Sequence, residues 1–380
     1  MPWALLAAGC VAMFAASGSG STRAPFLLDM ARDLGTSVPL VANIMATTSI
    51  AWGVSSLFAG AGSDRWGRRP FLIGGPIALA LCLIGVDSAG SFLGVLLWAT
   101  LSGGSAGSFT GVIMDEVSAR TIDRQRGRAL GWAMSGQSLA LLVGVPAAAG
   151  IGAFIGWRGV SLCVAAIALL GAIGLFVTTL QPTDAPRAAG TKRPSYATAL
   201  SGPVLRLLAM GVAERTCYGV TVVFFATFLQ ATYALSLGAV AIPLALFAAG
   251  NILGTVVGGQ LADRLPNRLH VYAGTMLCSA VLSLALFNWT SGLAVSVALG
   301  FAYVFTVAIA RPSLMASLAG VPEEVRGTVL GLNVASASMG WLGASALGGW
   351  IMATQGFAGF GALTAAVAVL GGVLALSARR

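Results

Sequence analysis

The chain has 380 residues, of which 57% are hydrophobic and only 9% are charged, and its net charge is +9. This composition is more apolar than that of soluble domains and predicts an all-α integral membrane protein. A basic excess would suggest nucleic acid as a partner of a soluble protein, but we expect none here, because the basic residues gather between long apolar runs.

Apolar runs of about 20 residues, long enough to cross about 30 Å of hydrocarbon, recur along the whole chain. The first begins with MPWALLAAGC and lacks the basic region of a signal peptide, so we interpret it as a membrane span. The sequence thus predicts twelve transmembrane helices, at residues 4–27, 38–60, 71–87, 91–114, 128–153, 157–180, 204–230, 238–262, 269–288, 292–315, 328–353 and 357–377.

The loops between these helices differ in charge from one side of the membrane to the other. An even number of spans puts both ends of the chain on one side, and that side receives most of the arginine and lysine residues. The opposite loops hold only Arg23, Arg32 and Arg158. By the positive-inside bias, the basic side is the cytoplasm. We therefore expect a bacterial-type inner (plasma) membrane, with both termini cytoplasmic.

Residues typical of metal sites and enzymes are scarce. The five cysteines all lie inside apolar runs and form no CxxC pair, which predicts neither a disulfide framework nor a metal site. The single histidine, His270, lies at a loop edge, away from any Ser/His or metal-binding cluster. We expect a protein without a cofactor and without enzyme activity.

The two halves of the chain repeat one pattern. RGRALG at residues 126–131 returns as RGTVLG at residues 326–331. This repeat predicts that six helices have been duplicated in parallel, giving two pseudo-symmetric six-helix bundles at residues 1–180 and 204–380. The intervening residues 181–203 are polar, basic and rich in proline and glycine, which is typical of a cytoplasmic linker.

Charge is concentrated in one loop of each half. GAGSDRWGRRP, residues 60–70, holds four charges, and GGQLADRLPNR, residues 258–268, repeats its Asp-Arg pair. Together with the twelve-span repeat, these loops make the chain resemble the major facilitator superfamily over essentially its full length. That family writes its loop between helices 2 and 3 as GxLaDRxGRR. In this chain Gly62 replaces the leucine, and in the second copy Pro266 replaces the second glycine.

The resemblance implies a role for the charged loops as a conformational latch. In the family, the loop is thought to hold the two bundles together on the cytoplasmic side while the cavity opens outward. We expect Asp64 to face the positive N-terminal end of helix 11, and Arg68 to pair with Asp115 or Glu116. The alternative is a mere positive-inside anchor, to which an acidic residue would contribute nothing. The latch candidates are Gly60, Asp64, Arg65, Gly67, Arg68, Arg69, Asp115, Asp263 and Arg264.

Ionisable residues are rare inside the predicted spans and are functional candidates, because each costs about 2.5–3.5 kcal/mol on insertion scales. Glu214 and Arg215 lie about 15 Å into helix 7, and Arg311 lies about 12 Å into helix 10. The resemblance implies that helices 1, 4, 7 and 10 line a central cavity. Arg215 points about 100° away from Glu214, so we expect it to pair with a neighbouring helix or to extend toward the interface. The candidates for substrate binding or proton coupling are Glu214, Arg311, Arg215, Tyr218, Tyr303, Ser102 and Phe109.

Three interpretations of Glu214 stay open at this point. It is a proton carrier, a counter-ion for a cationic substrate, or a fixed structural partner of Arg311. Burial favours the protonated acid and a close guanidinium favours the carboxylate, so proton coupling requires the pair to separate during the cycle. Proton-coupled members of the family often carry an arginine in helix 4, within RxxQG, but residues 99–103 of this chain contain none.

The function that we predict is secondary active transport by alternating access between the two bundles. The resemblance is greatest to the drug and metabolite exporters, which include drug:proton antiporters, so we expect a monomeric exporter of a small amphipathic organic solute across the bilayer, with protons as the candidate coupling ion. The alternative is facilitated or coupled uptake of a small organic anion, with Arg311 and Arg215 as its counter-charges.

Overall fold

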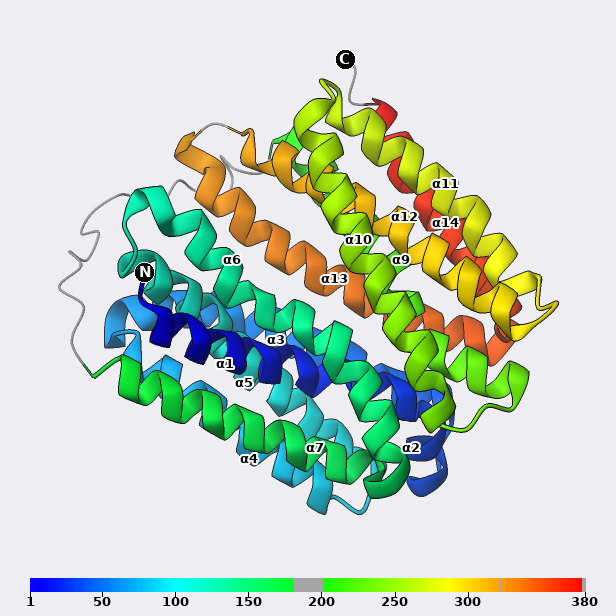
Figure 1. Cartoon of the computed structure of the whole chain (residues 1–380), viewed down its shortest axis with the longest axis horizontal. Helices are drawn as coiled ribbons and strands as arrows, with labels where there is room; N and C mark the ends of the chain where they lie inside the picture. Colours follow the sequence, from blue (N-terminus) through cyan, green and yellow to red (C-terminus); the bar gives the residue numbers. More distant parts are fainter. Residues whose placement is uncertain (181–200, 322, 378–380) are drawn as a thin grey trace. The chain divides into compact units, whose positions relative to one another are not determined.

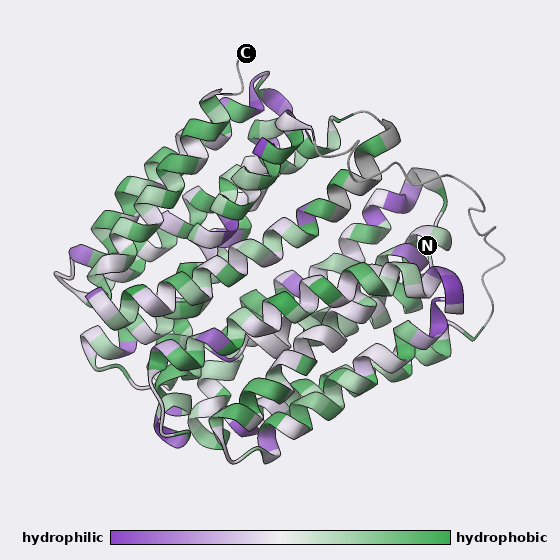
Figure 2. Cartoon of the chain, turned by 180° about the vertical axis from the view of Figure 1, so that it is seen from behind, coloured by the Kyte–Doolittle hydropathy of each residue, from purple (hydrophilic) through white to green (hydrophobic). Residues whose placement is uncertain are grey.

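A computed structural model describes residues 1–180, 201–321 and 323–377, and in this part of the chain all regular structure is helical (Figure 1). The all-α class is thereby confirmed. Helices are the expected solution for an apolar chain, because the hydrocarbon core offers no water to pair with backbone N–H and C=O groups. Figure 2 shows that hydrophobic residues cover the helices along most of their length.

Within residues 1–180 the chain forms seven α-helices, a short 3₁₀ helix (η1) and a short π-helix (η2). In chain order these are α1 (Trp3–Ser21), η1 (Ala24–Phe26), α2 (Leu27–Asp33), α3 (Val38–Trp66), α4 (Arg69–Ser88), α5 (Phe92–Ala119), α6 (Asp123–Leu139), η2 (Ala140–Gly144) and α7 (Val145–Thr178). The second half forms α9 (Gly202–Tyr233), η3 (Gly238–Val240), α10 (Ala241–Arg264), α11 (Arg268–Asn288), α12 (Leu293–Ala319), α13 (Glu323–Gln355) and α14 (Ala358–Leu376).

Ten helical segments within the described residues are long and apolar enough to cross a membrane. One of them, Gln125–Thr178, has 54 residues, about twice the length that a crossing needs. It turns at Gly156, whose φ of 71° favours glycine, and the chain turns again at Gly356, with φ 68°, between α13 and α14. The 33-residue α13 is also long enough to cross. The arrangement is therefore compatible with the twelve predicted spans.

The chain divides into two compact units. Unit 1 comprises Met1–Thr191 with Leu237–Ala241, and unit 2 comprises Lys192–Ser236 with Ile242–Arg380. Residues 181–200 of the predicted linker lie outside the described residues. In unit 1, α1 packs on α6 and α7, and α3 packs on α5. In unit 2, α9 packs on α12, α13 and α14.

Close contact between α3 and α5 depends on a glycine. A Cβ atom added to Gly103 would collide with the carbonyl oxygen of Thr48, whereas one added to Gly104 would come no closer than 4.0 Å to Ala51. Small residues of this kind let helix backbones approach each other in membranes, where the hydrophobic effect gives helices no reason to associate.

We therefore expect Gly103→Ala to force α3 and α5 apart and to lower the free energy of unfolding by about 1–3 kcal/mol. Its neighbour on the same helix supplies the control, since Gly104→Ala adds the same methyl group at ordinary contact distance. Thermal unfolding of both purified variants in detergent measures the difference. Equal melting temperatures would show that α3 is free to shift without cost.

Candidate functional site

Glu214 lies in the middle of α9 and only 1% of its surface is exposed. Arg311 of α12 donates two hydrogen bonds to Glu214 Oε1, from Nε at 3.1 Å and from Nη2 at 2.8 Å. The two residues thus pair directly inside unit 2. A charge-assisted contact of this length is among the stronger interactions available to side chains.

Arg215 joins the same carboxylate, with its Nε 3.5 Å from Glu214 Oε2. The expectation that Arg215 would turn to a neighbouring helix or to the interface for its partner is therefore wrong. Its Cα does face α13, where a Cβ atom on Gly340 would collide with the Arg215 Cβ, but the long side chain returns to Glu214. Two guanidinium groups share one carboxylate, so the cluster carries a net charge of about +1.

The arginines of this cluster are not sealed from their surroundings. The side chains of Arg215 and Arg311 are 26% and 19% exposed, against 1% for Glu214. Arg311 Cζ lies 4.9 Å from the centre of the Tyr218 ring, a distance typical of a cation–π contact. Tyr218 in turn packs edge-on against Trp341. The acid is thus enclosed, while both arginine side chains are partly exposed.

The Tyr303 hydroxyl makes its hydrogen bond to the backbone of α9 and not to a side chain of the charged cluster. Its side chain is fully buried and its hydroxyl donates to the carbonyl oxygen of Cys217 at 3.0 Å. This bond ties α12 to α9 three residues beyond Glu214. Tyr303 thereby contributes to the packing that fixes the distance between the two helices carrying Arg311 and Glu214.

The two candidates in unit 1, Phe109 and Ser102, have different surroundings. Phe109 is fully buried and belongs to the apolar core of the unit, where it packs against Gly75 of α4. Ser102 instead accepts a hydrogen bond from Arg23 Nη2 at 3.3 Å and donates to the Ala99 carbonyl at 2.7 Å. Ser102 therefore has a charged partner, whereas Phe109 is part of the packing.

Arg23 does not lie in an outer loop, which corrects the sequence prediction. Only 3% of it is exposed, and it lies in the short turn between α1 and η1, inside a helical segment that runs from Trp3 to Asp33. The reason is that the apolar chain continues through η1 into α2 rather than ending in the solvent. The signal was present in the sequence, because Arg23 falls within the predicted first span, residues 4–27.

The first charged loop begins inside a helix. α3 continues to Trp66, so Asp64 and Arg65 belong to its last turn, and Gly67 ends the helix with a φ of 86°. In the second copy, α10 ends at Arg264, and Pro266 stands in the place of this glycine. Proline cannot adopt a positive φ, so the second loop does not repeat the conformation of Gly67. Both Asp263 and Arg264 are exposed.

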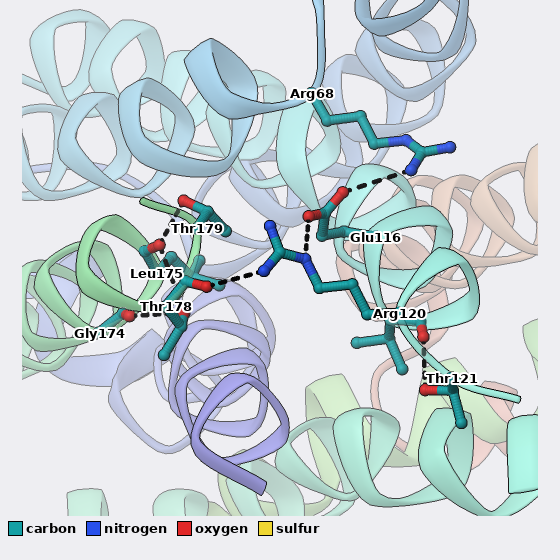
Figure 3. Close-up of polar contacts among 9 residues, drawn as sticks. Arg68, Glu116, Arg120, Thr121, Gly174, Leu175, Thr178 and Thr179 are labelled. Atoms are coloured by element: carbon teal, nitrogen blue, oxygen red, sulfur yellow. Dashed lines mark hydrogen bonds and ion pairs between the residues drawn. The ribbon is translucent and has the colours of Figure 1, made fainter. Parts of the chain in front are cut away.

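Glu116 is the centre of the polar contacts behind this loop (Figure 3). Its Oε2 accepts from Arg68 Nη1 at 3.3 Å, and its Oε1 accepts from Arg120 Nε at 2.6 Å. Arg120 Nη1 also donates to the Thr178 carbonyl at 3.1 Å. These contacts join the α3–α4 turn, α5 and the end of α7. Of the two acids expected to meet Arg68, Glu116 is buried in this contact and Asp115 is exposed.

Arg120 is not among the latch candidates predicted from the sequence, although it stands four residues after Glu116, a spacing that brings side chains together on a helix. The remaining loop cations pack on aromatic rings: Arg65 lies over Trp66, with Cζ 5.6 Å from the ring centre, and Arg69 over Phe176 at 5.2 Å.

The expected contact of Asp64 with the start of helix 11 would join the two units and stays a prediction. Among the described residues, no group of three or more His, Cys, Asp or Glu side chains could hold a metal ion.

Comparisons with known sequences agree with this architecture. A sequence profile of the Major Facilitator Superfamily matches residues 9–228 and 207–380. A chloramphenicol resistance protein of Streptomyces lividans is 28% identical over 281 residues, which cover 73% of this chain and 70% of that protein. An inner membrane transport protein of Escherichia coli O157:H7 is 28% identical over 300 residues, covering 77% and 75%. Multidrug resistance protein D of Escherichia coli K12 is 33% identical over 172 residues, covering 43% and 42%.

A solved structure has the same fold over nearly the full chain. It is that of a bacterial homolog of the human lysosomal transporter Spinster, in an inward-facing and occupied conformation. The TM-score is 0.83, with 98% of this chain and 96% of that chain covered, and 17% of the residues are identical. This likeness concerns the arrangement of the helices.

Proposed function

Because the chain belongs to the major facilitator superfamily, whose members are transporters and not enzymes, we propose that it is a secondary active transporter that exports small amphipathic organic solutes. It is a multi-pass protein whose surroundings are the lipid bilayer and whose partner is a small molecule. The basic loops favour cytoplasmic termini and a bacterial inner membrane. The names of two relatives, a chloramphenicol resistance protein and a multidrug resistance protein, support export of organic solutes.

The buried cluster of Glu214, Arg311 and Arg215 is the observation on which this proposal depends. Charges inside membrane spans are costly, and they persist where they bind a ligand, move a proton or stabilise each other. A carboxylate held between two partly exposed guanidinium groups offers all three uses. Alternating access would let Glu214 exchange its arginine partners for a proton or a solute during the cycle.

Reconstituted vesicles test the proposal. The purified protein in proteoliposomes should move chloramphenicol or another amphipathic solute from a mixed panel, and an opposing pH gradient should drive its accumulation if protons are the coupling ion. Protein-free vesicles give the background. A folded protein that moves no solute of the panel, with or without a gradient, would contradict the transport proposal.

Arg311→Ala should reduce transport more than Arg215→Ala does. Arg311 makes two hydrogen bonds to Glu214, whereas Arg215 makes one longer contact, so removing Arg311 disturbs the carboxylate more. We expect a loss of at least about tenfold in the initial rate for Arg311→Ala, equal to about 1.4 kcal/mol. Initial rates per folded protein give the comparison. Equal rates in both variants and the wild type would remove the cluster from the transport cycle.

A second candidate function is transport of a small organic anion in the uptake direction. The observation that favours it is the excess of positive charge at the cluster, since two arginines meet one carboxylate. An anionic solute would neutralise the remaining guanidinium charge. Competition by anionic and neutral members of the same solute panel separates this candidate from the first.

A further inference from the structure

Arg23 is a buried cation whose charge is not balanced by the residues around it. Nη2 donates to Ser102 Oγ at 3.3 Å, but within the described residues Nε and Nη1 have no hydrogen-bond partner. The nearest acids in sequence are engaged elsewhere. Asp29 lies 3.9 Å from Arg32, and Asp33 accepts from Trp157 Nε1 at 2.8 Å.

The guanidinium group lies deep in unit 1. Its partner Ser102 is ten residues into α5, which corresponds to about 15 Å from the first residue of that helix. The position thus combines burial with unused hydrogen-bond donors.

An arginine in this environment is expensive to maintain. Its guanidinium group stays charged at any physiological pH, and a buried charge without a counter-charge costs several kcal/mol. Arg311 of unit 2 shows the usual remedy, because Glu214 balances it directly. Among the residues of unit 1 that the structure describes, none forms an ion pair with Arg23, so an anionic ligand would supply the missing counter-charge.

We propose that Arg23 and Ser102 form an anion-binding site inside unit 1, and that it takes the carboxylate group of a small organic solute. The free N–H groups of Arg23 supply charge-assisted donors, and the Ser102 hydroxyl supplies a neutral one by turning from the Ala99 carbonyl. That the anion is part of the transported solute rests on the transport function proposed above.

Benzoate and benzamide, which share a ring and differ in charge, test the site in the purified full-length protein. We expect benzoate to raise the melting temperature in a saturable way and benzamide at equal concentration to leave it unchanged. Arg23→Gln should weaken the benzoate effect at least tenfold, and Ser102→Ala should weaken it severalfold. Arg32→Gln is the matched control, because the Arg32 side chain is 77% exposed and lies in the same segment.

The stability of Arg23→Gln without ligand gives an independent readout. Removing an unbalanced buried charge should leave the melting temperature equal or higher, whereas an arginine needed only for packing would make this variant less stable. Should Arg23→Gln fail to fold, Arg23→Lys replaces it, with benzoate binding expected to persist at lower affinity. The inference is overturned if benzoate does not stabilise the wild type, or if it stabilises wild type and Arg23→Gln equally.

Transport assays separate this inference from the proposed function. If benzoate binding depends on Arg23 but no solute crosses the vesicle membrane, the site stands and the transport proposal fails. If wild type and Arg23→Gln transport neutral solutes equally and neither binds benzoate, transport stands and the anion site fails.

Discussion

Glu214→Gln should produce the largest loss of stability of any single substitution in the cluster, about 3–5 kcal/mol in the free energy of unfolding. The amide keeps the shape of the side chain but leaves Arg311 and Arg215 without their shared negative charge. Both arginines would then repel each other across a neutral group inside a membrane span. Chemical or thermal unfolding of the purified protein in detergent measures the loss.

A double-mutant cycle provides the control. Glu214→Gln combined with Arg311→Met removes both members of the closest pair, so the double variant should be more stable than the sum of the two single losses predicts. Strictly additive losses would show that the 2.8 Å contact contributes no coupling energy.

Transport by the folded Glu214→Gln protein distinguishes the three interpretations of the acid. A proton carrier predicts loss of gradient-driven accumulation with solute exchange retained, because exchange needs no net proton movement. A counter-ion predicts weaker binding of cations and normal handling of neutral solutes. A purely structural acid predicts normal transport with unchanged pH dependence in whatever protein folds. The second arginine on Glu214 argues against the counter-ion, since a cation would have to approach two like charges.

Most of the fold could be predicted from the sequence, because the length and repetition of apolar runs reflect the thickness of the bilayer. The ends of the helices were predicted less accurately than the helices themselves. α3 extends to Trp66, where the apolar run predicted an end near residue 60, and α13 begins at Glu323 rather than near residue 328. Hydropathy follows the hydrocarbon layer, whereas helices continue into the polar interface with charged residues in their first or last turns.

The part of the site that could be predicted consists of charged residues within apolar runs, because burying a charge in a membrane is costly. Glu214 and Arg311 were found because charges within apolar runs are rare, and the structure brings them together. The direction of Arg215 was not predictable from helical angle, because its long side chain can return to an adjacent residue. Arg23 was assigned to a loop because counting charges by side of the membrane ignores whether each charge is buried.

Glu116→Gln should cause the second large loss, about 1.5–3 kcal/mol in the free energy of unfolding for the charge-assisted hydrogen bonds to Arg68 and Arg120. Glu116 is buried and holds both cations, and through Arg120 it connects to the last turn of α7. Without its charge, the loop carrying Asp64 would lose the contact that fixes it to α5. We therefore expect slower transport as well as a lower melting temperature.

Asp115→Asn is the matched control for this loop, because Asp115 is the preceding residue on the same helix and is exposed. An exposed ion pair contributes about 0–1 kcal/mol, so this variant should unfold close to the wild-type temperature. If Asp115→Asn proves as damaging as Glu116→Gln, the exposed acid has a partner that matters more than the buried contact. If Glu116→Gln slows transport while Arg68→Gln does not, then Arg120 and α7, rather than the charged loop, carry the effect. Parallel losses in Glu116→Gln and Arg68→Gln are the result expected if their contact holds the charged loop against α5.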